Sequence, residues 1–287
     1  MKLGIIGTGN VGNAIALTAA TRGSAREIVL VNRTRKVAEA VSTDLRYGIP
    51  LGPRIDISDG DYDALNGAGV VLITSGVNEK TGGATDRSDP QGRLRLLEKN
   101  AAIYRDIVPK IAGAAPQAVL VAVTDPPDPL ADIARNVASH DRVLSTGTFL
   151  DSLRFRVHLG AHFGVDPRQL EAQVLGDHGT SQVFLWSSAR VAGVPLATLL
   201  QERGENLTDL RAKVERGVRY ANITIIEGHD ASQYGIGRLG EANATTRFHQ
   251  SNCWISRCLA ARGSAAQFAL MFAALITFAH FSVSDFM

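Results

Sequence analysis

The stretch Lys2-Leu3-Gly4-Ile5-Ile6-Gly7-Thr8-Gly9-Asn10-Val11-Gly12 decides the fold class of this chain. An apolar run ends at the first of three glycines spaced G-x-G-x-x-G, and the alanine-rich residues 13–21 that follow are typical of a helix. Between a buried strand and a helix, Gly7 permits a tight turn, Gly9 lets the backbone approach a pyrophosphate, and Gly12 lets helix and strand pack closely. The N-terminus of the helix then faces the anion. We therefore predict a dinucleotide-binding β/α unit at the start of the chain.

Apolar strands and helical stretches alternate through the rest of the first half. Beyond the opening strand, we expect strands at residues 27–31, 54–57, 70–74, 118–123 and 142–145, and helices at residues 13–21, 34–45 and 96–112. This alternation predicts parallel β/α units in an α/β architecture, a doubly wound Rossmann sheet over residues 1–146. In the second half, residues 150–163 and 209–227 read as helices and residues 173–191 alternate like antiparallel strands. We expect an α+β substrate domain over residues 147–287.

The bulk composition narrows the class of protein. With 45% hydrophobic and 20% charged residues among 287, the chain is typical of a soluble globular protein, and a net charge of +2 gives no reason to expect a nucleic acid or a membrane as partner. The two cysteines, Cys253 and Cys258, offer neither a disulfide framework nor a metal site, which favours a reducing compartment. Residues 2–6 already read as a strand, so we expect no signal peptide, a cytoplasmic location and no bound metal.

The residue after the second strand bears on the choice of cofactor. An acidic residue about 20 positions beyond the glycines typically holds the ribose hydroxyls of NAD, but this chain has Asn32 there, followed by Arg33 and Arg35. A missing carboxylate removes repulsion against a 2′-phosphate, and guanidinium groups can hold one, so NADP is as open as NAD. Alternatively, Asn32 binds ribose and the cations are solvated. The predicted cofactor site consists of Gly7, Gly9, Asn10, Val11, Gly12, Asn32, Arg33, Thr74, Gly76 and Thr124.

A histidine, a carboxylate and an arginine form the candidate catalytic group. A histidine side chain can gain and lose a proton under physiological conditions, so His178 can exchange a hydroxyl proton while a cofactor carries hydride. Asp151 is the candidate partner that fixes its tautomer, and Arg154 lies three residues further along the same predicted helix, with a planar fork suited to a substrate carboxylate. A structural histidine and an ordinary ion pair within a helix are the alternative interpretations.

Five stretches, at residues 7–12, 124–128, 147–156, 176–187 and 232–237, make the chain resemble the lactate/malate dehydrogenase family. The resemblance implies a homodimeric or homotetrameric oxidoreductase that moves hydride between NAD(P) and an L-2-hydroxy acid or its 2-oxo acid. It implies that His178 donates and accepts the proton, that Asp151 is its partner, and that Arg154 anchors the substrate carboxylate. A lactate-type activity is the first hypothesis and a malate-type activity the alternative.

The same resemblance assigns further residues to the substrate. Arg93 would polarise the substrate carbonyl, with Arg87 as a rival because malate enzymes carry a string similar to residues 86–89. Ser232 falls where the family often has a threonine lining the substrate pocket. Asp125 stands where the family normally has an asparagine that supports substrate and nicotinamide. Glu79 falls where lactate enzymes tend to have glutamine and malate enzymes arginine, so it would disfavour a second carboxylate at the distal end of the substrate.

The resemblance is expected to stop near Arg238. Residues 239–287 hold both cysteines, six of the ten phenylalanines and few charges. This shift in composition favours an out-of-frame or replaced ending over an apolar helix in a subunit interface, and residues 265–281 are slightly short for a membrane span. A damaged ending would leave a catalytically impaired nucleotide-binding protein, which is the alternative to an active enzyme.

Overall fold

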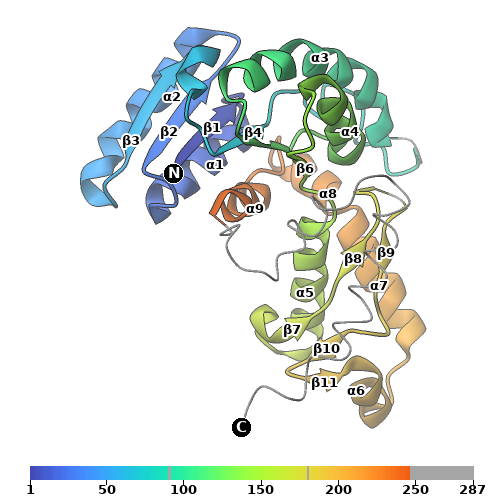
Figure 1. Cartoon of the computed structure of the whole chain (residues 1–287). Coiled ribbons are helices and arrows are strands. Elements are labelled where there is room, and N and C mark those ends of the chain that lie inside the picture. Colours follow the sequence, from blue (N-terminus) through green and yellow to red (C-terminus); the bar gives the residue numbers. More distant parts are fainter. Residues whose placement is uncertain (90–91, 180, 246–287) are drawn as a thin grey trace. The chain divides into compact units, whose positions relative to one another are not determined.

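The computed structural model describes residues 1–89, 92–179 and 181–245, and its first half is a parallel sheet flanked by helices (Figure 1). The six strands run in the order β3-β2-β1-β4-β5-β6, with the bounds β1 Lys2–Ile6, β2 Glu27–Val31, β3 Asp56–Gly60, β4 Val70–Ile73, β5 Val119–Ala122 and β6 Val143–Ser145. The helices between them are α1 Asn10–Arg22, α2 Arg35–Gly48, α3 Leu97–Ala114 and α4 Pro127–Ala138, with 3₁₀ turns η1 Ile49–Leu51, η2 Tyr62–Leu65 and η3 Gly92–Leu96. The predicted doubly wound Rossmann architecture is confirmed.

The strands are apolar because helices cover both faces of the sheet. Successive residues of a strand point to opposite faces. Leu3 and Ile5 of β1 accordingly enter one core with Ile15 of α1, while Ile6 enters the other core with Tyr104 of α3. Burial on both sides gives the sheet the rigidity to hold the loops that follow its strands.

The order of the strands reverses between β1 and β4, which pair in parallel from Leu3↔Val70 to Ile6↔Ile73. The connections from β1 and β2 lead toward one edge of the sheet and those from β4 and β5 toward the other. In such sheets, ligands bind in the crevice beyond the carboxyl ends of the strands at this switch point. The glycine turn after β1 lies there beside the loop after β4.

Two elements differ from the sequence expectation. β3 was expected at residues 54–57 and lies at Asp56–Gly60, because it pairs with β2 from Glu27↔Asp56 to Val31↔Gly60 and so extends into polar residues. α4 was not expected at all. Its first turn carries proline, which the first turn of a helix tolerates, and Leu130 and Ala134 then face the core.

The second half packs short antiparallel strands and helices around α5, Phe149–Phe163. The other elements are η4 Pro167–Gln169, β7 Leu170–Glu171, β8 Val174–Leu175, β9 Val183–Phe184, β10 Arg190–Val191, β11 Val194–Pro195, α6 Leu196–Arg203, α7 Leu207–Arg219 and α8 Ala221–Gly228. Phe155 of α5 lies at the centre of this core, edge-on to Phe184 and Trp186. One end of α5 is thereby fixed, and its first turn is held near the carboxyl edge of the large sheet.

The single helix expected over residues 209–227 was wrong. α7 and α8 are separated by Tyr220, whose φ of −105° and ψ of 11° leave the helical region. No proline marks this break, so the apolar pattern alone does not reveal it. The break redirects the chain so that Asn222, in the first turn of α8, lines the same cavity as the glycine turn after β1.

The last described helix, α9 Tyr234–Thr245, packs on α1. A Cβ at Gly237 would come within 2.7 Å of Ala14, so glycine is needed for this close approach. α9 continues past Arg238, and most of residues 239–287, including the apolar stretch at 265–281 and both cysteines, lie outside the described residues. Among the residues that are described, no helix is long and apolar enough to cross a membrane. The domain boundary at Thr146 stays a prediction.

Candidate active site

A cavity opens at the carboxyl edge of the sheet, at the switch point between β1 and β4. Its wall combines the glycine turn, the loops after β4 and β5, and side chains from η3, α5 and α8. The predicted residues that line it are Gly9, Asn10, Val11, Thr74, Gly76, Glu79, Arg93, Thr124, Asp125, Arg154, His178 and Ser232. Residues far apart in the sequence therefore meet in one place.

The glycine turn has the geometry that a dinucleotide needs. Gly7 has a φ of +100°, and a Cβ at Gly12 would lie 1.9 Å from the Gly7 carbonyl oxygen, so both positions require glycine. A Cβ at Gly9 would meet nothing within 4 Å, which leaves open space beside the backbone at the N-terminus of α1. Thr74 closes the base of the turn by donating a 2.8 Å hydrogen bond to the Gly7 carbonyl. The turn fits a bound pyrophosphate.

Asn32 is held within the protein at the end of β2. Its Nδ2 donates to Thr8 at 2.7 Å, and its Oδ1 accepts the backbone N–H of Thr34 at 3.0 Å. Arg35 is tied to Asp59, with Nε 2.6 Å from the carboxylate, whereas Arg33 is exposed. Of the cations expected near a 2′-phosphate, Arg35 already has a carboxylate partner.

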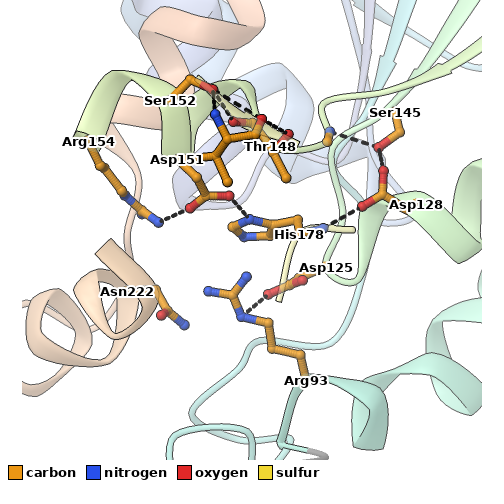
Figure 2. A network of polar contacts seen from close by, with 12 residues as sticks. Arg93, Asp125, Asp128, Ser145, Thr148, Asp151, Ser152, Arg154, His178 and Asn222 are labelled. Atoms are coloured by element: carbon orange, nitrogen blue, oxygen red, sulfur yellow. Dashed lines mark hydrogen bonds and ion pairs between the residues drawn. The ribbon is translucent and has the colours of Figure 1, made fainter. Parts of the chain in front are cut away.

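His178 and Asp151 form a direct pair at the centre of the cavity wall (Figure 2). The Asp151 carboxylate is 1% exposed, contacts His178 Nδ1 through one oxygen, and lies 3.2 Å from Arg154 Nη1 through the other. Burial alone would raise the pKa of Asp151, but the hydrogen bond from His178 and the charges of His178 and Arg154 lower it below its usual value. The carboxylate is therefore ionised, and it fixes which nitrogen of the ring faces it.

A second aspartate, which the sequence did not single out, holds the backbone of His178. Asp128 in the first turn of α4 accepts the His178 backbone N–H at 2.8 Å and the Ser145 hydroxyl at 2.6 Å (Figure 2). Asp128 also acts on the pKa of the neighbouring Asp177. Burial, and then its hydrogen bond and like charge with Asp128, raises the pKa of Asp177 to about 6. Asp128 ends the stretch at residues 124–128 that resembles the family, and this position was the available signal for it.

Arg93 and Asp125 form a half-buried ion pair across the cavity from Asp151, with Arg93 Nε 3.4 Å from Asp125 Oδ2. Figure 2 shows the terminal nitrogens of Arg93 turned toward His178 and Asn222. Burial raises the pKa of Asp125 to about 6, against the opposing charges of Arg93 and His178, and Glu79 adds to the increase. Arg93 Nη1 and Asp125 Oδ1 are both buried without a hydrogen-bond partner.

Two asparagines missed by the sequence reasoning position this part of the cavity. Asn100 of α3 accepts the Val77 backbone N–H at 2.8 Å and donates to the Asp125 carbonyl at 2.7 Å, which ties the loops after β4 and β5 together. Asn222 of α8 donates to the Glu79 carboxylate at 2.8 Å. Buried amides are weak signals in a single sequence, because nothing distinguishes them from solvated ones.

Arg87 is the one predicted substrate residue that does not line the cavity. Its guanidinium is bound to Glu227 and lies 3.2 Å from the Thr224 hydroxyl, on the exposed side of α8. It is not among the residues that line the cavity, whereas its rival Arg93 is. Ser232 does line the cavity, next to Ala231. Among the described residues, no group of three histidine, cysteine or acidic side chains is placed to hold a metal ion.

Comparison with known proteins gives matches along most of the chain. Residues 1–145 match a sequence profile described as the NAD-binding domain of lactate/malate dehydrogenase, and residues 148–274 match the α/β C-terminal domain of the same family. The L-lactate dehydrogenase of Thermus aquaticus is 42% identical over 240 residues, which are 83% of this chain and 75% of that protein. The L-lactate dehydrogenase of Deinococcus radiodurans is 43% identical, over 83% of this chain and 76% of that protein.

Solved structures agree with these matches. A lactate dehydrogenase from a Medee basin deep-sea metagenome library superposes with a TM-score of 0.78 at 31% identity, over 88% of this chain and 79% of that one. The minor L-lactate dehydrogenase of Enterococcus mundtii superposes with a TM-score of 0.76 at 30% identity, over 85% of this chain and 76% of that one.

Proposed function

This chain belongs to the lactate/malate dehydrogenase family, and we propose that His178, Asp151, Arg154 and Arg93 carry its reaction. It is an NAD-dependent oxidoreductase that interconverts a 2-hydroxy acid and a 2-oxo acid. One observation supports the assignment of residues above all. The His178 ring, fixed by a buried carboxylate, lies in the same cavity as the glycine turn that fits a pyrophosphate.

The proton step belongs to His178. With Nδ1 held by Asp151, the other ring nitrogen is free to take the proton of the substrate hydroxyl as the hydroxy acid is oxidised. The ionised Asp151 then stabilises the imidazolium that forms, as a carboxylate does in other histidine sites. In reduction the same nitrogen returns the proton to the carbonyl oxygen. A bound nicotinamide cofactor would accept the hydride in oxidation and supply it in reduction.

The two arginines have separate tasks. Arg154, on the helix that also carries Asp151, presents a planar fork that suits a substrate carboxylate. Arg93 points its terminal nitrogens toward His178, where they can polarise the C2 oxygen. Holding the acid at both its carboxylate and its C2 oxygen aligns the reacting carbon against the cofactor.

The finer specificity is also a proposal. Glu79 and Asn222 lie in the cavity, and Arg87 is held outside it by Glu227, which supports a monocarboxylic substrate over a dicarboxylic one. The relatives that are named L-lactate dehydrogenase support the same substrate class. Two like charges about 4 Å apart repel by roughly 4 kcal/mol at an effective dielectric constant near 20, before solvent relaxes, so Glu79 would reject a distal carboxylate.

For the cofactor we propose NAD as the physiological partner, with NADP as the second candidate. Asn32 carries no charge that would repel a 2′-phosphate, but Arg35 is already paired with Asp59, which leaves the exposed Arg33 as the cation to hold one. We further propose that the protein acts in the cytoplasm as a homodimer or homotetramer, as its family implies.

An absorbance assay at the NADH band tests the function. Purified protein should oxidise NADH with pyruvate or 2-oxobutyrate and prefer both to oxaloacetate. His178→Ala should retain NADH affinity and lose at least about 10²-fold in kcat, the usual effect of a lost acid–base group. Glu79→Arg should move the preference toward oxaloacetate. NADH binding without turnover of any 2-oxo acid would instead support a catalytically impaired nucleotide-binding protein.

A further inference from the structure

The ion pair between Arg93 and Asp125 leaves one donor and one acceptor without partners in the same cavity. Arg93 Nη1 is a buried donor with no acceptor, and Asp125 Oδ1 is a buried acceptor with no donor. Leaving such groups unpaired costs free energy, so they are usually satisfied by a ligand or by water. The pair is fixed in place, because Asn100 holds the Asp125 backbone and the Asp125 carboxylate holds Arg93 Nε.

The chemistry of the two orphan atoms selects the group that would satisfy both. A hydroxyl accepts one hydrogen bond and donates another, so it can accept from Arg93 Nη1 and donate to Asp125 Oδ1. A carbonyl oxygen only accepts, so it satisfies Arg93 and faces the Asp125 carboxylate oxygen without a proton between them. Glu79 lies within hydrogen-bond distance of Asp125, so a protonated Asp125 can donate to Glu79 or to a bound oxygen, whereas an ionised Asp125 accepts from a hydroxyl.

We propose that Arg93 and Asp125 form a receptor for the C2 hydroxyl, so that ionised Asp125 makes the cavity bind a 2-hydroxy acid in preference to the corresponding 2-oxo acid. This inference rests on the proposed function and adds to it a preference for one of the two substrates. Asp125 is the specificity-determining residue. Protonated Asp125 donates instead, and then the carbonyl of the oxo acid becomes the better partner.

The surroundings of Asp125 place the loss of its proton near pH 6. Burial raises the pKa of Asp125 to about 6, while Arg93 and His178 oppose the rise and Glu79 adds to it. Asp177, whose own pKa is raised to about 6, also faces Asp125. Above that pH the carboxylate is ionised and favours the hydroxy acid. Below it the protonated form favours the oxo acid.

His178 imposes a preference of the same sign, because neutral imidazole accepts the hydroxyl proton and imidazolium donates to the carbonyl. The number of protons that the enzyme takes up on binding distinguishes a contribution of Asp125 from that of His178 alone. If both act, the oxo acid binds with two more protons on the enzyme than the hydroxy acid does. The ratio of the two dissociation constants should then change by a factor that approaches about 10² per pH unit, and by about 10 if His178 acts alone.

The experiment uses the full chain saturated with NADH, in which neither probe reacts. Dissociation constants of (S)-lactate and of oxamate, a 2-oxo acid analogue that cannot be reduced, are measured from NADH fluorescence between pH 5 and 8. For wild-type protein at pH 8, we expect the ratio of oxamate to lactate constants to exceed that of Asp125→Asn by about 10-fold or more, as for a hydrogen bond to a charged group. Asparagine keeps the shape of the side chain and offers a donor at every pH.

Asp132→Asn is the matched control, because it makes the same substitution at an exposed carboxylate that is paired with Arg135 on α4 and does not line the cavity. It should leave the two dissociation constants and their ratio within about twofold of wild type. The wild-type slope with pH should exceed that of Asp125→Asn by about one proton.

Three results would overturn the inference. The first is an equal ratio of the oxamate and lactate constants in Asp125→Asn and wild type. The second is a wild-type change of that ratio with pH that corresponds to one proton. The third is an Asp125→Asn variant that changes NADH affinity and nothing else, which would assign Asp125 to the cofactor. The slope is measured on wild-type protein, so it decides the matter even if the variant does not fold. Failure of wild-type protein to bind either acid and to turn over any 2-oxo acid would contradict the proposed function itself.

Discussion

Replacing Asp151 by asparagine should disable the proton step while leaving the cavity in place. Asp151 uses both carboxylate oxygens, one on His178 Nδ1 and one on Arg154 Nη1 at 3.2 Å. Asparagine has one oxygen and one NH₂ group. If the oxygen stays on the arginine, the NH₂ group donates to His178 Nδ1, and the neutral ring must carry its proton on the other nitrogen. That tautomer cannot accept the proton of a hydroxy acid.

The size of the loss follows from the charge that is removed. Unit charges 3.2 Å apart attract by about 5 kcal/mol at an effective dielectric constant near 20, and the imidazolium of His178 lies no further from the carboxylate than Arg154 does. Each 1.36 kcal/mol is a factor of ten in rate. If between half and all of the attraction to the imidazolium is lost, kcat should fall by roughly 10² to 10⁴, and the upper end equals the loss of about 10⁴ known for an aspartate-to-asparagine change in a Ser-His-Asp triad.

The assay compares two asparagine variants beside the same histidine. Asp128→Asn keeps an oxygen that can accept the His178 backbone N–H, and Asp128 does not touch the ring, so we expect less than about a 10-fold loss. Single-turnover hydride transfer is followed by NADH absorbance, with NADH affinity and the unfolding temperature measured on each protein. Equal losses in the two variants, or near wild-type turnover in Asp151→Asn, would refute the role given to Asp151.

Three other substitutions test the remaining parts of the site. Arg154→Lys keeps the charge and loses the fork, so KM for the 2-oxo acid should rise by about 10-fold or more while NADH affinity holds; the reverse pattern would contradict carboxylate anchoring. Asn32→Asp should raise the ratio of kcat/KM with NADH to that with NADPH, and an unchanged ratio would mean that this side chain does not contact the ribose. Gly12→Ala should lower the unfolding temperature and cofactor affinity together, because its Cβ would lie 1.9 Å from the Gly7 carbonyl; unchanged calorimetric and binding curves would contradict this.

The sequence was sufficient for the parallel sheet, and most of the charged residues that it suggested for the substrate line one cavity. Strands buried on both faces are continuous apolar runs, and the glycine spacing fixes the first turn, so the Rossmann half could be predicted from local pattern alone. β3 was misplaced because its extent is set by pairing with β2 rather than by its own polarity. α7 and α8 were merged because the break at Tyr220 carries no glycine or proline at that position.

What the sequence could not give is the partner of each side chain. Asp128 belongs to the same short stretch as Asp125, yet its contact with the His178 backbone spans fifty positions along the chain. Arg87 and Arg93 are close in sequence and have the same side chain, and the difference between them comes from Glu227 of α8, which binds Arg87 and keeps it outside the cavity. Contacts of this kind are made by the folded chain and leave no local periodicity.

The two central aspartates show how one residue type takes two roles in one cavity. Loss of solvent alone would raise the pKa of each. Asp151 has a donor on each oxygen and opposite charges on both sides, so its pKa falls below the usual value and it stays ionised beside His178. Asp125 has one arginine at 3.4 Å and faces a second carboxylate, so its pKa rises to about 6. Carboxylates whose surroundings separate their pKa values can do different work in the same reaction. A permanent charge at Asp151 suits the partner of a histidine that cycles its proton, and a titrating charge at Asp125 suits a residue that distinguishes the hydroxyl from the carbonyl.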